Sequence, residues 1–224
     1  MNFTMEYYLL KYEELSVLSD TKKCRTSLMR NKDTGELVVK KEMGKESFSV
    51  YSLLKSIKNK NLIKVLECFR DEDKTIEIEE YVNGKRLDDY FREKKATLEQ
   101  VVDVGIALCE GLAPMHKLNL VHRDIQPKNI IITNEGSLKI IDFDISRKEN
   151  ENATHDTTLL GTVGYAAPEQ YGFAQTTNRS DIYSIGAVLK ELSSFSELDK
   201  IIAKCMEMDP ANRYENVEQL ENEL

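Results

Sequence analysis

The sequence predicts an α+β protein with two lobes, a small strand-rich N-terminal lobe and a mainly helical C-terminal lobe. Up to residue 82 the apolar residues fall in short segments with partial alternation, which is typical of strands. From Leu87 onward they follow a helical period instead. The Asn83-Gly84 pair lies where the pattern changes, and such a pair favours a turn. We therefore expect two lobes, residues 1–82 and 83–224, that together form one domain.

Composition and charge exclude several classes of protein. The chain has 224 residues, 41% of them hydrophobic, which is enough to bury one sizeable core or two small ones. Its formal net charge of -8 argues against general binding to a nucleic-acid backbone. The four cysteines have no C-x-x-C spacing, and no apolar window approaches the roughly 18 residues of a membrane span. We expect a cytoplasmic protein that binds neither nucleic acid nor membrane.

Five strands and one helix are expected in the N-terminal lobe. A turn before the third strand supplies Gly35, the residue type that a tight hairpin favours. Phe48, Tyr51 and Leu54 recur every three residues, which predicts a short amphipathic helix over residues 45–57. The expected strands cover residues 9–18, 24–30, 36–41, 62–69 and 75–81.

The C-terminal lobe is predicted to consist of helices around one hairpin. Residues 98–117 are too rich in apolar side chains for one exposed face, which indicates a buried helix. Two apolar runs, 129–133 and 137–141, surround an Asn-Glu-Gly turn and predict a hairpin. The remaining helices are expected over residues 181–192, 198–208 and 216–224. Only residues 193–197 separate the first two of these helices, which leaves no room for a further helix between them, so we expect a shortened lobe.

Five motifs in the C-terminal lobe are the ones that carry chemistry. They are, in order, His122-Arg123-Asp124 with Asn129, then Asp142-Phe143-Asp144, then Gly-Thr-Val-Gly-Tyr-Ala-Ala-Pro-Glu over residues 161–169, then Ser-Asp-Ile-Tyr-Ser-Ile-Gly over residues 180–186, and finally Arg213. In these features the sequence resembles the protein kinase family, most of all the small bacterial serine/threonine protein kinases. The matches span almost the whole chain, and the resemblance implies the bilobal kinase fold.

The resemblance implies transfer of the γ-phosphoryl group of ATP to a protein hydroxyl. Asp124 would then orient the hydroxyl, while Asn129 and Asp142 would supply oxygen ligands suited to Mg²⁺, with Mn²⁺ as the second candidate metal. Arg213 would pair with Glu169 at the end of the Ala-Pro-Glu motif. The expected partners are ATP and a protein with a serine or threonine acceptor. Any regulatory input would come from a separate partner protein or from the chain's own loop.

The resemblance also implies where the nucleotide binds. Leu37-Val-Val-Lys40 is similar to the family's third strand, whose final lysine binds the phosphates. Alternation along the strand puts Val38 and Lys40 on one face, so Val38 would contact adenine, and a slip of one residue would replace Lys40 with Lys41. By the same resemblance Ile131 would contact adenine from its other side. The backbone from Glu80 to Val82 would bind its edge.

The carboxylate that should hold the phosphate lysine is absent from its usual place. In the alignment with the family, Val50 occupies the position of the glutamate on the helix, and Glu46 lies one turn earlier. Glu79 falls at a position beside the nucleotide pocket that is usually apolar or threonine in the family. We expect Glu79 to pair with Lys40 instead. The alternative is a slip in the alignment that leaves Glu79 on the solvent face.

Other departures concern the phosphate loop and the catalytic loop. Gly35 is the first glycine of the chain, so the turn that should cover the phosphates contains none. Gln126 replaces the usual lysine two residues after the catalytic aspartate, which predicts slower turnover. Asp144 replaces the glycine of Asp-Phe-Gly and adds a negative charge near the metal.

The segment between the second and third motifs is expected to hold a regulatory site. Thr154, Thr157 and Thr158 lie in this polar stretch, and a phosphate on Thr157 or Thr158 could pair with Arg123 and order the loop. A flexible loop with incidental threonines is the alternative. Thr162 resembles the family threonine that contacts the catalytic aspartate and favours serine or threonine acceptors.

Three functions are consistent with these residues. The leading hypothesis is a serine/threonine protein kinase that uses Lys40, Asp124, Asn129 and Asp142, with low activity as one form of it. The alternative is a pseudokinase, a nucleotide-binding or scaffolding module, which the missing glycines and Gln126 favour. A third hypothesis, a small-molecule phosphotransferase, is disfavoured by the Ala-Pro-Glu motif and Arg213.

Overall fold

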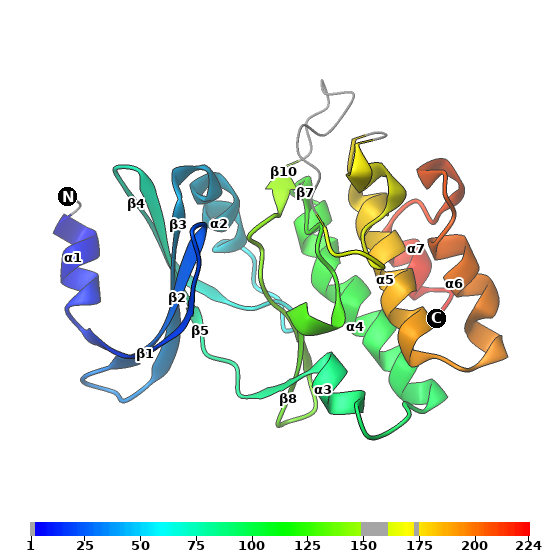
Figure 1. The fold of residues 1–224 in the computed structure, drawn as a ribbon, viewed down its shortest axis with the longest axis horizontal. Coiled ribbons are helices and arrows are strands. Elements are labelled where there is room, and N and C mark those ends of the chain that lie inside the picture. The colour runs from blue at the N-terminus through cyan, green and yellow to red at the C-terminus, as the bar shows by residue number, and fades with distance from the viewer. Residues whose placement is uncertain (1–2, 149–160, 173–174) are drawn as a thin grey trace. The chain divides into compact units, whose positions relative to one another are not determined.

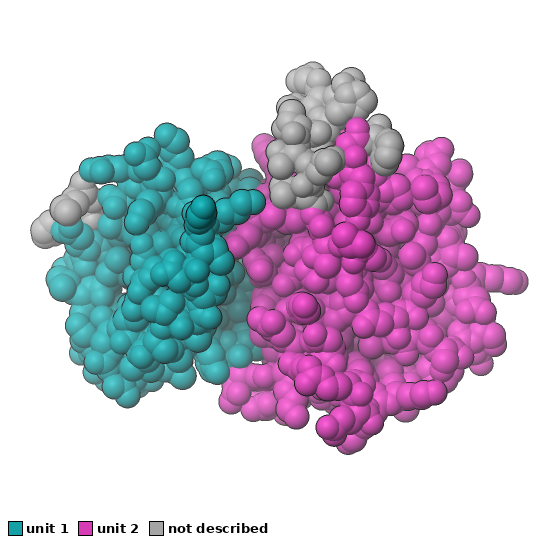
Figure 2. Space-filling model, viewed as in Figure 1, with its two compact units in different colours: residues 1–58, 63–82 teal, residues 59–62, 83–224 magenta. Residues whose placement is uncertain are grey.

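The computed structural model describes residues 3–148, 161–172 and 175–224. The chain divides into two compact units, shown in different colours in Figure 2. Unit 1 comprises residues 1–58 and 63–82, and unit 2 comprises residues 59–62 and 83–224. No helix among the described residues is long and apolar enough to cross a membrane.

The short segment 59–62 belongs to unit 2, although the sequence placed it in the N-terminal lobe. Its side chains explain the difference. The Nδ2 atom of Asn59 donates to the carbonyl oxygen of Glu110 at 2.9 Å, and that of Asn61 donates to the carbonyl oxygen of Leu138 at 3.0 Å. These long-range hydrogen bonds satisfy polar groups that are buried within unit 2. Such partners have no signal in the local sequence pattern.

Unit 1 is built on a five-stranded antiparallel sheet with strand order β1-β2-β3-β5-β4. Its five strands agree with the five that were predicted, to within a few residues at each end. Figure 1 shows α1 and α2 on opposite sides of this sheet. The elements are α1 (Phe3–Leu9), β1 (Tyr12–Asp20), β2 (Cys24–Asn31), β3 (Leu37–Gly44), η1 (Lys45–Ser47), α2 (Phe48–Leu54), β4 (Val65–Asp71) and β5 (Lys74–Glu80).

Helix α1 is the element of unit 1 that the sequence pattern missed. Residue 9 was assigned to a strand, but it ends a helix, and the first strand begins at Tyr12. Met5 on this helix is 5% exposed and packs against the sheet with Val38 and Ile78. The helix is too short to be stable in isolation, so its apolar contacts with the sheet hold it in place. Tyr8 stacks on Tyr12 with ring centroids 5.4 Å apart and extends this packing.

Unit 2 contains the remaining helices and, within its described residues, two small sheets. Helix α4 begins with a capping box, in which Thr97 Oγ1 accepts from the backbone nitrogen of Gln100 and the Gln100 side chain accepts from the backbone of Thr97. The elements of unit 2 are β6 (Gly84–Arg86), α3 (Leu87–Phe91), α4 (Leu98–His116), β7 (Leu120–Val121), η2 (Pro127–Asn129), β8 (Ile130–Thr133), β9 (Leu138–Ile140), β10 (Arg147–Lys148), η3 (Pro168–Tyr171), α5 (Asn178–Leu192), η4 (Ser196–Leu198), α6 (Asp199–Cys205), η5 (Pro210–Asn212) and α7 (Val217–Glu221).

The predicted hairpin of unit 2 is present as β8 and β9. Strand β6 joins them to form a three-stranded sheet, and β7 pairs with β10 in a separate two-stranded one. The hairpin connects the first two motifs, because Asn129 precedes β8 and Asp142 follows β9. Antiparallel pairing of Ile130 with Ile140 brings the two ends of the hairpin to the same edge.

The packing of α1 on the sheet leads to a prediction about the stability of unit 1. Met5→Ala is expected to lower the free energy of unfolding of unit 1 by about 2 kcal/mol, because it removes a buried side chain from the apolar cluster on the sheet. Tyr7→Ala on the same helix is the control, since Tyr7 is 63% exposed, and its effect should stay within about 0.5 kcal/mol. Urea unfolding measures both. An unchanged midpoint for Met5→Ala would mean that α1 does not pack on the sheet in solution.

Candidate active site

The carboxylate of Asp124 is held on both of its oxygens. Thr162 Oγ1 donates to Oδ1 at 2.9 Å. Asn129 Nδ2 donates to Oδ2 at 2.8 Å and also to the backbone oxygen of Asp124 at 2.9 Å. These neutral donors fix the orientation of the carboxylate without cancelling its charge. Asp124 remains partly exposed, so it is accessible to a substrate.

Gln126 has a role that the sequence did not reveal. Its Nε2 atom donates to Asp124 Oδ2 at 2.9 Å and to Thr162 Oγ1 at 2.7 Å. The amide therefore connects the catalytic loop to the segment that carries Thr162. The sequence marked Gln126 only as the loss of a positive charge, whereas the structure makes it a bridge between the two groups.

The loop that carries Asp124 is anchored by a buried carboxylate on α5. Asp181 is fully buried, and its two oxygens accept from the backbone nitrogens of His122 at 2.9 Å and Arg123 at 2.8 Å. His116 Nε2 donates to the same carboxylate at 2.9 Å. Burial alone would raise the pKa of Asp181, but the hydrogen bond from His116 and the surrounding donors outweigh it and hold the pKa below its usual value. The carboxylate is therefore charged at neutral pH.

Backbone strain is concentrated in the same region. Arg123 has φ of 72° and Asp142 has φ of 67°, in the left-handed region that residues with a Cβ rarely adopt. The anchor at Asp181 and the packing of Phe143, which is 1% exposed, hold these conformations in place. The rings of His122 and Phe143 lie 5.0 Å apart, and burial lowers the pKa of His122, so this imidazole is neutral at physiological pH.

The two predicted metal ligands have the donor chemistry that a magnesium ion requires. The amide nitrogen of Asn129 donates its hydrogen bonds to Asp124, so the amide oxygen is the atom that could bind a cation. Asp142 Oδ1 accepts from the backbone nitrogen of Asp144 at 3.3 Å, and Oδ2 is the second oxygen of this carboxylate. Across residues 3–148, 161–172 and 175–224, no cluster of three or more His, Cys, Asp or Glu side chains could hold a metal. These hard oxygen ligands suit Mg²⁺ that takes its other ligands from phosphates and water.

The predicted pair of Glu169 and Arg213 is confirmed. The guanidinium binds the carboxylate with two parallel hydrogen bonds, 2.7 Å from Nη1 to Oε1 and 2.9 Å from Nη2 to Oε2. Both side chains are almost fully buried, and Ser180 Oγ donates to the same carboxylate at 2.6 Å. The remaining guanidinium hydrogens reach backbone oxygens, among them that of Glu207 at 2.8 Å from Nε. The pair ties the Ala-Pro-Glu motif to the C-terminal helices.

Thr154, Thr157 and Thr158 lie outside the described residues. Arg123, their expected partner, is 3% exposed, and its backbone oxygen accepts from Gln170 Nε2 at 2.8 Å.

In unit 1 the buried lysine is Lys41. Its Nζ atom lies 3.4 Å from Oε1 of Glu79, and the two side chains are 8% and 7% exposed. Lys40 projects from the other face of β3, where its Nζ atom pairs with Glu42 at 2.9 Å. The predicted pairing of Glu79 with Lys40 is therefore wrong, because neighbouring residues on a strand point to opposite faces.

The two valines of β3, Val38 and Val39, also lie on opposite faces of the sheet. Val38, expected beside adenine, is 1% exposed in the cluster that α1 covers, which leaves almost none of its surface for a ligand. Val39 lies two residues from Lys41, so both occupy the opposite face. Ile131 and Val82 are partly exposed, and Glu80 Oε1 accepts from the backbone nitrogen of Lys64 at 2.9 Å.

Backbone amides of the turn between β1 and β2 form hydrogen bonds within the turn itself. Thr21 Oγ1 accepts from the backbone nitrogens of Lys23 at 3.3 Å and Cys24 at 3.0 Å, and the backbone nitrogen of Thr21 donates to the oxygen of Cys24 at 3.0 Å. In the family this turn is rich in glycine and covers the phosphates. Here the amides are occupied by a compact threonine turn, so they do not form an open cradle.

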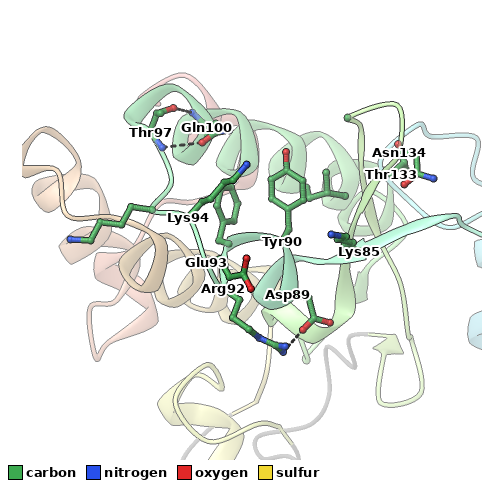
Figure 3. Close-up of a pocket in the computed structure, with 14 residues that line it drawn as sticks. Lys85, Asp89, Tyr90, Arg92, Glu93, Lys94, Thr97, Gln100, Thr133 and Asn134 are labelled. Atoms are coloured by element: carbon green, nitrogen blue, oxygen red, sulfur yellow. Dashed lines mark hydrogen bonds and ion pairs between the residues drawn. The ribbon is translucent and has the colours of Figure 1, made fainter.

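A separate hollow lies on unit 2, between α3 and the β8–β9 turn. It encloses about 1010 Å³ and is lined by side chains that include Lys85, Tyr90 and Lys94. Figure 3 shows the Asp89–Arg92 ion pair and the Thr97–Gln100 hydrogen bonds among its lining residues. None of the predicted catalytic or metal-binding residues lines it.

Comparison with known proteins agrees with this arrangement. The protein kinase domain family matches residues 12–198, which excludes α1. A probable serine/threonine-protein kinase of Clostridium perfringens is 30% identical over 203 residues, covering 75% of this chain and 30% of that protein. One of Clostridium acetobutylicum is 29% identical over 202 residues, covering 75% and 31%. Wall-associated receptor kinase-like 3 of Arabidopsis thaliana is 36% identical over 163 residues, covering 69% and 22%.

The chain spans less than a third of the length of these relatives. The family match nevertheless covers most of the chain and includes all of the catalytic-loop residues and the Ala-Pro-Glu motif. The antiparallel sheet of unit 1 and the helices of unit 2 are the two lobes that this family has. The chain belongs to the protein kinase family.

Proposed function

We propose that this chain is an ATP-dependent protein kinase that phosphorylates serine or threonine hydroxyls. The observation that carries the proposal is the carboxylate of Asp124, held on both oxygens by Thr162, Asn129 and Gln126. A carboxylate fixed in this way orients an incoming hydroxyl and accepts its hydrogen bond. Phosphoryl transfer depends mainly on positioning and on stabilisation of charge, and needs little further chemistry from the protein.

Asn129 and Asp142 are the residues that would hold the divalent metal, with Mg²⁺ as the first candidate and Mn²⁺ as the second. When bound, the metal would neutralise charge on the phosphate oxygens. Asp144 adds a carboxylate next to this position, and its backbone nitrogen donates to Asp142. That hydrogen bond helps to orient the carboxylate of Asp142.

For the nucleotide, the faces of the sheet favour Lys41 as the phosphate lysine in place of Lys40. Lys41 is the lysine with a buried carboxylate partner, whereas Lys40 lies on the face that α1 covers. On the same argument Val39 replaces Val38 as the apolar contact of adenine, together with Ile131. The backbone of Glu80 and Val82 stays the proposed hydrogen-bond partner of its edge.

The acceptor class follows from Thr162 and from the relatives. The hydroxyl of Thr162 donates to Asp124, as the resemblance to serine/threonine kinases implies. Two of the relatives are named probable serine/threonine-protein kinases. A purely scaffolding role is disfavoured because Asp124, Asn129 and Asp142 are all retained in a connected arrangement. Regulatory input from a partner protein is part of this proposal.

Asp124→Asn is expected to lower the rate of phosphoryl transfer by at least about 100-fold, because the amide cannot accept the hydroxyl proton. The measurement is peptide mass spectrometry of the chain and of a generic acceptor protein after incubation with ATP and Mg²⁺, repeated with Mn²⁺. Glu135→Gln, at an exposed turn, is the matched control and should leave the rate unchanged. Absence of phosphate from the wild type under both metals would contradict the proposed activity.

Lys41→Met is expected to weaken the binding of Mg²⁺–ATP about 10-fold to 100-fold, because the phosphates lose a charged hydrogen-bond donor. Lys40→Met should change it less than about 2-fold, since Lys40 pairs with Glu42 on the other face. Isothermal titration calorimetry on the two variants compares neighbouring lysines in one strand. A larger loss for Lys40→Met would restore Lys40 as the phosphate lysine.

A further inference from the structure

We infer that Glu79 is the positioning residue for Lys41, and that this carboxylate on a strand does the work that a carboxylate on the helix does elsewhere in the family. The inference rests on the proposed function, because it concerns how the same nucleotide site holds its cation. The Nζ atom of Lys41 and Oε1 of Glu79 are 3.4 Å apart, and both side chains are buried. Water and salt screen such a pair weakly, so the carboxylate restrains the ammonium group strongly.

The register of two neighbouring strands creates this pair. Lys41 on β3 lies directly opposite Glu77 on β5, and Glu79 is two residues further along β5 on the same face. Diagonal neighbours across an antiparallel pair are within reach of long side chains. Strand β5 is flanked by β3 and β4, so Glu79 projects from an interior strand. Glu77 is also fully buried, and the recorded ion pair of Lys41 is with Glu79.

Helix α2 offers no acidic side chain for this purpose. Its seven residues, Phe48–Leu54, include none, and Val50 at the position of the family's glutamate is buried as an apolar residue. Glu46 precedes the helix and is exposed, and its carboxylate lies against Gly44. Because α2 has no acidic residue, the ion pair between Lys41 and Glu79 is the observation that identifies Glu79 as the partner carboxylate.

The physical consequence concerns regulation. A carboxylate on a helix reaches the lysine only when the helix is packed correctly, whereas Glu79 is held by the same ladder of hydrogen bonds that holds Lys41. The position of the ammonium group then depends on the pairing of β3 with β5 and not on α2. Lys41 therefore stays positioned for nucleotide whenever the sheet is folded.

A double-mutant cycle on nucleotide affinity tests this inference. Calorimetry with Mg²⁺ and a non-hydrolysable ATP analogue compares the wild-type chain, Glu79→Gln, Lys41→Met and the double variant. We expect Glu79→Gln to weaken binding about 10-fold, since it removes the charged partner of Lys41. The double variant should bind no more weakly than Lys41→Met alone, because Glu79 acts through Lys41. Losses that add would indicate a merely structural role and would overturn the inference.

Two further variants keep the test decisive. Glu46→Gln is the matched control and should change the affinity less than about 2-fold; a large effect there with none at Glu79 would assign the carboxylate to Glu46 instead. Should Glu79→Gln fail to fold in urea titrations, Glu79→Asp replaces it, because the shorter side chain keeps the charge that compensates Lys41 but moves the carboxylate away from its Nζ atom. A wild-type chain that does not bind the analogue would overturn the proposed function, whereas normal binding by Glu79→Gln would overturn this inference alone.

Discussion

The arrangement of unit 2 depends on one buried carboxylate, that of Asp181. It accepts hydrogen bonds from two consecutive backbone nitrogens, those of His122 and Arg123. The catalytic loop is therefore held through its main chain and not through its own side chains. A buried charge without donors would cost several kcal/mol. Here the hydrogen bonds from His116 and the two amides offset this cost. They also stabilise the positive φ of Arg123, a conformation that the loop would not keep without them. The orientation of Asp124 follows directly from this anchor, because it is the next residue.

Buried charge recurs at two other points, and each joins elements that are distant in sequence. Glu169 and Arg213 join the Ala-Pro-Glu motif to the C-terminal helices. Lys41 and Glu79 join two strands of unit 1. Burial of such pairs contributes little net stability, since desolvation offsets most of the attraction. Their value lies in specificity, because removal of one partner leaves an uncompensated charge, so alternative packings are strongly disfavoured.

The sequence predicted the elements well and the faces poorly. Partial alternation located the five strands, a dense apolar run located the long helix, and the motifs predicted the Glu169–Arg213 pair that the structure confirms. It misplaced the partner of Glu79 by one residue, since Lys40 matches the family pattern more closely than Lys41, whereas the packing of α1 on one face of the sheet leaves Lys41 on the face of Glu79. Helix α1 itself was missed because seven residues give too few turns for a clear period. The bridging role of Gln126 needs three-dimensional contacts that no local pattern contains.

The departures from the family pattern share one physical theme. A neutral amide, Gln126, takes a position usually held by a charged side chain and is fixed by hydrogen bonds to Asp124 and Thr162. A strand carboxylate, Glu79, takes the role of one on a helix, and a threonine turn at Thr21 replaces a glycine loop. In the last two cases a group on a strand or in a closed turn replaces one on a mobile element. Fewer conformational degrees of freedom remain to be ordered when nucleotide binds, so the entropic cost of assembling the site falls, while close backbone contact with the phosphates is given up.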